Sequence, residues 1–185
     1  MHGVIVMKSF RGLALLLLTV FTAARAETPA ASKGAWPGVA YAHVVAYLYD
    51  PEVDDRGNSI VFADGTHHRG IIAPYTRNLM PAQVKRLEAL LNPEKEPAFD
   101  EAKCFIPHHG IVFYDEDWKP VASLDLCLTC VDFRARPAHP LKDLDWQAFA
   151  EFFRKLGMPV LEDSAGPDAY AKLFARHHLT TPEEE

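Results

Sequence analysis

The chain has 185 residues, of which 49% are hydrophobic and 24% are charged, and its formal net charge at pH 7 is −6. This length is typical of one domain, and the hydrophobic fraction is sufficient to form a core. An acidic chain without a Lys/Arg cluster is a poor candidate for binding nucleic acid or an anionic membrane surface.

The first 26 residues have the pattern of a secretory signal peptide. Lys8 and Arg11 form a basic start, residues 12–22 are an apolar run, and residues 24–26 (Ala-Arg-Ala) have the small-residue pattern of a cleavage site. The apolar run is too short for a membrane-spanning helix. We therefore expect a periplasmic or secreted protein with no membrane span after cleavage. Because the removed segment holds three of the 19 basic residues and none of the 25 acids, residues 27–185 carry a net charge of −9.

The rest of the chain is predicted to form one domain. Residues 27–40 are small and contain proline and glycine, which favours a flexible lead-in. Residues 41–179 are expected to be the folded domain, and residues 180–185 a disordered acidic tail.

The first third of this domain carries two strand patterns with a loop between them. Residues 41–49 and 59–62 are rich in β-branched and aromatic side chains, which is typical of strands. Residues 50–58 contain four acids, but their spacing does not match an EF-hand, so we expect a solvated loop. His67 and His68 are expected to be exposed loop residues, the alternative being a ligand that reaches the cysteine cluster described below.

Three segments have helical patterns. Residues 81–92 begin with a proline suited to the first helical position and end before Pro93. Residues 146–156 follow a capping residue, Asp145, and precede a glycine that can take the left-handed conformation. The third helix is expected over residues 167–177. The expected core includes Val112, Phe113, Trp146, Phe149 and Phe153.

A central β-hairpin is predicted over about residues 110–128, because two strand-like runs flank the polar segment 115–119. Residues 131–140 are predicted to be an irregular crossing. Together these patterns predict an α+β fold, in which a small antiparallel sheet with a central hairpin is packed by about three helices.

The hairpin gathers all three cysteines and two adjacent histidines at its open end. With the turn centred on Asp117, His109 faces Asp125, and Cys104 faces Cys130. A slip of one residue would exchange the two faces of the strand but would leave the cluster at the same end.

The first interpretation of the cluster is a disulfide between Cys104 and either Cys130 or Cys127, with the third thiol buried and inert. Exported cysteines usually oxidise. Closing a loop of about 25 residues would stabilise the fold by roughly 3 kcal/mol in the chain-entropy model.

The second interpretation is a zinc site, in which Cys104, His108, Cys127 and Cys130 supply a Cys3His ligand set. This set would explain the odd number of cysteines. His109 is the alternative ligand to His108, or else it lies outside the ligand set and acts through a hydrogen bond with Asp125.

The third interpretation is redox chemistry at Cys127 and Cys130, which form a Cys-x-x-Cys motif. No helical pattern starts directly behind the motif, so it lacks the strand-motif-helix order of thioredoxin-like proteins.

The segment from residue 104 to residue 130 resembles exported bacterial proteins of unassigned function, which share Cys-Phe-x-Pro-x-His-x-x-x-Phe-Tyr, a short turn and a strand that ends in Cys-x-x-Cys. The resemblance implies export and the hairpin, and it implies no activity. We expect a small exported binding or structural protein with a metal or disulfide at the hairpin end. The alternative is a thiol-disulfide oxidoreductase using Cys127 and Cys130.

Overall fold

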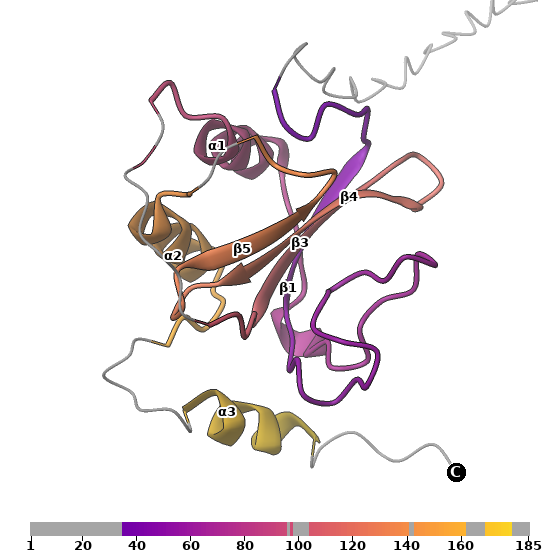
Figure 1. Ribbon diagram of the computed structural model, residues 1–185, viewed down its shortest axis with the longest axis vertical. Coiled ribbons are helices and arrows are strands. Elements are labelled where there is room, and N and C mark those ends of the chain that lie inside the picture. The colour runs from indigo at the N-terminus through magenta and orange to yellow at the C-terminus, as the bar shows by residue number, and fades with distance from the viewer. Residues whose placement is uncertain (1–34, 96, 98–103, 141–142, 162–168, 179–185) are drawn as a thin grey trace, which may run out of the picture.

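The computed structural model describes residues 35–95, 97, 104–140, 143–161 and 169–178. These residues form a five-stranded antiparallel sheet with three α-helices, which confirms the predicted α+β fold (Figure 1). The elements are β1 (His43–Leu48), η1 (Ala73–Tyr75, a 3-10 turn), β2 (Arg77–Asn78), α1 (Pro81–Leu91), β3 (His109–Tyr114), β4 (Pro120–Cys127), β5 (Asp132–Arg136), α2 (Trp146–Lys155) and α3 (Ala169–His178).

The strands lie in the order β2-β1-β3-β4-β5, with the predicted hairpin β3-β4 at the centre of the sheet. Its register matches the prediction only next to the turn, where Tyr114 faces Pro120. A bulge follows, because Phe113 faces Ala122 and leaves Val121 as the extra residue of β4. Beyond the bulge every pair is shifted by one residue.

Two other strand predictions are wrong. Residues 132–136, predicted to be irregular, form β5, an edge strand whose alternation of Phe133 and Ala135 with polar residues fits the pleat. Residues 59–62 form no strand of the sheet, and contribute only an isolated bridge between Val61 and His67.

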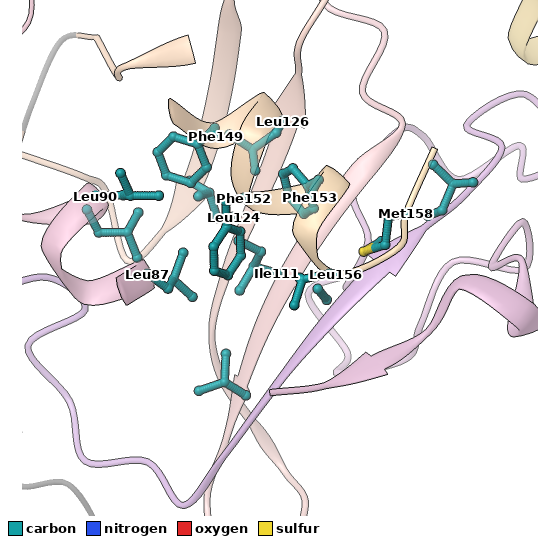
Figure 2. Close-up of a cluster of buried hydrophobic side chains, with 14 of the residues drawn as sticks. Leu87, Leu90, Ile111, Leu124, Leu126, Phe149, Phe152, Phe153, Leu156 and Met158 are labelled. Carbon is teal, nitrogen blue, oxygen red and sulfur yellow. The ribbon is translucent and has the colours of Figure 1, made fainter. Parts of the chain in front are cut away.

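One face of the sheet packs against α1 and α2 and forms the larger core (Figures 1 and 2). Asp145 caps α2 by accepting a hydrogen bond from the backbone N–H of Ala148 at 2.9 Å, and Gly157 ends the helix with a φ of +71°. Both helix signals are confirmed. The side chains that meet in this layer include Leu87, Leu90, Ile111, Leu124, Leu126, Phe149, Phe152 and Phe153.

The packed domain begins before residue 41. Trp36, which lies in the segment predicted to be a flexible lead-in, is buried and packs edge-on against Phe113 with ring centroids 5.4 Å apart. Its indole N–H donates to the carbonyl of Pro137 at 2.9 Å, and its backbone N–H donates to the side chain of Asn92 at 2.7 Å. The lead-in is therefore fixed to the domain at least from Trp36 onwards.

The opposite face of the sheet is covered by a long segment, residues 50–72, which we call the covering loop (Figure 1). Ile60 and Val61 of this loop form a second small core with Val45, Tyr49 and Val112 of the sheet. None of the helices in the described part of the chain combines the length and apolar character that a membrane crossing needs.

Gly110 allows the close approach of the covering loop, because a Cβ atom at this position would lie 2.8 Å from two carbon atoms of the Ile60 side chain. We predict that Gly110→Ala lowers the free energy of unfolding by about 1–3 kcal/mol through overpacking. Denaturant unfolding of Gly110→Ala, Ile60→Ala and the double variant measures this. The double variant should lose less than the sum of the single losses, and strict additivity would contradict the contact.

Candidate functional site

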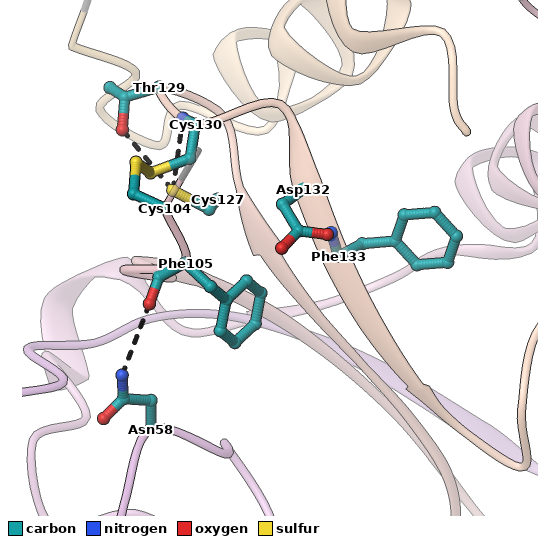
Figure 3. The surroundings of a disulfide bond; sticks show 8 residues. All are labelled: Asn58, Cys104, Phe105, Cys127, Thr129, Cys130, Asp132 and Phe133. Atoms are coloured by element: carbon teal, nitrogen blue, oxygen red, sulfur yellow. Dashed lines mark hydrogen bonds between the residues drawn. A yellow bond between two sulfur atoms is a disulfide. The ribbon is translucent and has the colours of Figure 1, made fainter. Parts of the chain in front are cut away.

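Cys104 and Cys130 form a disulfide, with their Cα atoms 5.5 Å apart (Figure 3). The disulfide prediction is confirmed, in its Cys104–Cys130 version. Cys130 lies in the turn between β4 and β5, so the bond attaches the segment before β3 to the far end of the hairpin. Cys104 is exposed and Cys130 is buried.

The third cysteine, Cys127, is a free thiol at the end of β4 with no exposed surface (0%). Its sulfur accepts a hydrogen bond from the backbone N–H of Cys130 at 3.2 Å, and it lies 3.5 Å from the hydroxyl of Thr129. The three predicted cysteines are therefore grouped, with a disulfide and a thiol in the same turn (Figure 3).

The two histidines of the cluster point elsewhere. The His109 ring packs on Phe153, and its Nε2 lies 2.8 Å from the carbonyl of Pro159, to which it donates. The shifted register places His109 opposite Leu126, so the predicted pairing with Asp125 is wrong. His108 stacks on Tyr170 of α3 with ring centroids 3.8 Å apart.

In the described residues, no three His, Cys, Asp or Glu side chains are grouped in a way that holds a metal ion. Two of the four predicted zinc ligands, Cys104 and Cys130, are joined to each other. Zinc binding by Cys104, His108, Cys127 and Cys130 stays a prediction.

A second feature, which the sequence analysis did not predict, is a groove along the face of β4 and β5 that lies beside the covering loop. It consists of two hollows, of about 480 and 530 Å³, and Arg136 lines both of them. We call it the β4–β5 groove. Its ionisable lining has both signs of charge: the acids are Asp64, Asp125 and Asp132, and the basic side chains are Lys119, Arg134, Arg136 and His139. Ser59 and Ser123 also line it.

Asp125 is the buried acid of this groove, with only 4% of its surface exposed. Its Oδ1 accepts a hydrogen bond from the backbone N–H of Ile60 at 2.7 Å and lies 3.2 Å from the hydroxyl of Tyr49. Burial raises the pKa of Asp125 to about 6, although these hydrogen bonds and the charge of Arg136 act in the opposite direction. The carboxyl group therefore both anchors the covering loop and titrates near neutral pH.

The two arginines lie on the same side of β5, because they are two residues apart in a strand. Arg134 faces Asp125 across the ladder, and Arg136 faces Ser123. The Arg134 guanidinium lies over the ring of Phe105, 4.1 Å from its centroid, and Arg136 donates from Nη1 to the carbonyl of Val61 at 3.3 Å.

The disulfide is also connected to a residue that lines this groove. Phe105 directly follows Cys104, and its carbonyl accepts a hydrogen bond from the side chain of Asn58 at 3.5 Å (Figure 3). Phe105 therefore connects the disulfide to Arg134 on one side and to the covering loop on the other.

The signal for the groove arginines is visible in the sequence. Residues 132–136 read Asp-Phe-Arg-Ala-Arg, an alternation that places both arginines on one face of a strand. Pro137 follows the alternation directly and ends it.

The histidines of the covering loop are not simple surface residues. His68 is buried, with Nδ1 accepting from the backbone N–H of Gly70 at 3.0 Å and Nε2 lying 3.1 Å from the carbonyl of Gly57. His67 is half-buried, and its Nε2 lies 2.6 Å from the hydroxyl of Tyr114. Both side chains therefore organise the loop and its attachment to the sheet.

The chain was compared with protein-family models, curated proteins and solved structures, and none of them matches it.

The anchoring role of Asp125 is tested by a pair of variants. Asp125→Ala removes the acceptor for the Ile60 N–H, so we expect a loss of about 1–3 kcal/mol in the free energy of unfolding. Asp125→Asn retains an acceptor oxygen and should lose clearly less. Denaturant unfolding at pH 7.5 measures both, and equal losses would contradict the role of the Oδ1 hydrogen bonds.

Buried histidines predict loss of stability in acid. Burial lowers the pKa of His108 to about 4 and that of His109 to about 3, so their stabilising effect is present above pH 6.5 and is lost as the pH falls. Asp125 acts in the opposite sense, since its raised pKa favours the folded state as the pH falls through 6. The two histidines outweigh it, and we expect a net loss on the order of 3 kcal/mol between pH 7 and pH 4.5.

Unfolding curves across this pH range measure the effect, with His109→Phe as the test variant. Phenylalanine keeps an aromatic ring against Phe153 but cannot titrate. The slope of the unfolding free energy with pH should therefore be shallower, whatever the absolute stability of the variant. An unchanged slope would show that His109 is not a source of the acid sensitivity.

Proposed function

We propose that the chain is a small exported binding protein, whose site is the β4–β5 groove and whose ligand is a small organic anion with two acceptor groups. Export is supported by the basic start, apolar run and small-residue cleavage pattern of residues 1–26. The Cys104–Cys130 disulfide is compatible with an oxidising compartment.

The observation that carries the proposal is a buried acid in a ligand-sized groove beside two arginines. Each hollow has a volume in the range of small-molecule sites. Asp125 supplies the perturbed pKa that is often found at functional sites. Asp125 faces Arg134 across the ladder, and the charge of Arg136 acts on its pKa. Protonation of Asp125 therefore changes the net charge of the groove.

The arginines determine the ligand class. Guanidinium groups recognise carboxylates through pairs of parallel N–H donors. The contact between Arg136 and Val61 uses one of the five N–H groups of that side chain, and the contact of Arg134 with Phe105 uses the face of its guanidinium. These contacts orient both groups and leave N–H donors for a ligand. Spaced two residues apart on β5, the arginines fit a molecule with two carboxylates better than one with a single acceptor.

Titration with tartrate tests the proposal, because both carboxylates of this probe are ionised at pH 5.5 and at pH 7.5. We expect binding in calorimetry and shifted NMR signals in β4 and β5. Arg134→Ala and Arg136→Ala should each raise the Kd about tenfold, the value of one lost charge-assisted hydrogen bond. Arg86→Ala, on the exposed face of α1, removes the same charge elsewhere and is the control.

The pH dependence adds an independent test of the same site. Wild-type binding should be tighter at pH 5.5, because protonated Asp125 no longer repels the anion. Asp125→Asn should bind at pH 7.5 as tightly as the wild type does at pH 5.5. Equal effects of Arg86→Ala and Arg136→Ala, or signal shifts confined to other parts of the chain, would contradict the groove as the site.

A further inference from the structure

We propose that the Cys127 thiol displaces Cys104 from the disulfide, so that Cys104 becomes a reactive surface thiol able to exchange with disulfides of other molecules. The structure gives the starting state of this exchange. The inference concerns the cysteine cluster and does not rest on anion binding in the β4–β5 groove.

The geometry places the attacking sulfur beside the residue it attacks. The backbone N–H of Cys130 lies 3.2 Å from the Cys127 sulfur and donates a hydrogen bond to it. Cys127 is the last residue of β4 and Cys130 lies in the turn that follows, and Figure 3 shows the Cys127 sulfur beside the disulfide. A Cys-x-x-Cys spacing is one that redox proteins close into a disulfide. The product of the exchange is therefore a disulfide across a Cys-x-x-Cys spacing.

The exchange balances without an external oxidant. The Cys127 thiolate attacks the sulfur of Cys130, the Cys104–Cys130 bond breaks, and a Cys127–Cys130 bond forms. Cys104 leaves as a thiolate and takes up the proton that Cys127 lost. One thiol and one disulfide are present before and after the step.

The exposure of the three cysteines gives the exchange its direction. Cys127 has no exposed surface, so a reagent or a partner disulfide in solution has no access to it in this state. Cys104, the leaving group, is exposed, so its thiolate forms in contact with water. The step therefore moves the free thiol of the protein from a buried position to the surface.

The backbone beside the disulfide is strained in the observed state. Val131, directly after Cys130, has a φ of +50°, a conformation that is rare for a β-branched residue. Such a conformation is unfavourable and persists only where its surroundings hold it. The Cys104–Cys130 disulfide is one of the bonds that hold this turn, and the exchange replaces it with a bond from Cys130 to the end of β4.

Alkylation under native conditions distinguishes exchange from a fixed disulfide. The oxidised protein is incubated with N-ethylmaleimide without reductant, then digested and mapped by mass spectrometry. We expect one label per chain at Cys104, with a disulfide between Cys127 and Cys130. A label at Cys127 would show that the buried thiol is reached by local opening, and no label on the native protein would show that no exchange occurs. Either result overturns the proposal.

Two variants complete the test. Cys127→Ser lacks the attacking thiol and should keep Cys104 unlabelled, with circular dichroism to confirm that it is folded. Cys104→Ser should form the Cys127–Cys130 disulfide when oxidised by glutathione disulfide, which keeps the test decisive if the first variant does not fold. If Cys127 and Cys130 of Cys104→Ser stay reduced, the turn does not allow the product disulfide and the proposal is wrong.

Glutathione disulfide also tests the outward reaction. Incubated with the oxidised wild-type protein, it should give a mixed disulfide with one glutathione on Cys104, while Cys127→Ser should give none. A mixed disulfide formed to the same extent in Cys127→Ser would assign the reactivity to direct attack on the exposed bond, contrary to the proposal.

Discussion

The burial of a carboxyl group between the sheet and the covering loop is the constraint on which the second face of this domain depends. Asp125 accepts a hydrogen bond from the backbone of Ile60 and lies near the hydroxyl of Tyr49, and this polar contact holds the loop on the face opposite to α1 and α2. Burying an unpaired carboxylate would be strongly unfavourable. The hydrogen bonds offset part of this cost, and the burial raises the pKa of Asp125 to about 6.

The two faces of the sheet are stabilised by different means. The helix face is mostly apolar and close-packed. Its ionisable strand residues include His109, which lies beside Phe153 and opposite Leu126, and Arg77, which donates from Nε to the carbonyl of Leu156 at 2.9 Å. The loop face is polar at β4 and β5. The apolar side chains of the covering loop pack on β1 and β3, and the loop contacts β4 and β5 through the hydrogen bonds of Asp125 and Arg136. Asp125 and Arg136 both line the β4–β5 groove.

The disulfide joins the hairpin end to the groove through a short path of contacts. Cys104 is fixed to Cys130, the next residue Phe105 supports the guanidinium of Arg134, and Asn58 of the covering loop donates to the carbonyl of Phe105. Cys104 is therefore connected through Phe105 to Arg134, a residue that lines the groove. The cysteine cluster and the groove are two chemically different sites with one structural segment in common.

The sequence by itself determined the local features of this protein. Asp145 and Gly157 mark the two ends of α2. The spacing of apolar residues predicts which side of each helix is buried. One hairpin brings the three cysteines together. These features depend on residues close together in the chain or on a single turn, so the sequence predicts them without knowledge of the fold.

Tertiary structure alone decided which face each residue occupies and what covers it. One extra residue at Val121 shifts the register, and because side chains alternate along a strand, it moves Asp125 away from His109 and onto the loop face. The alternating pattern of the hairpin fits both registers equally well. The partners of Asp125, Ile60 and Tyr49, lie more than 60 residues away in the sequence, and nothing in the local pattern of β4 indicates them.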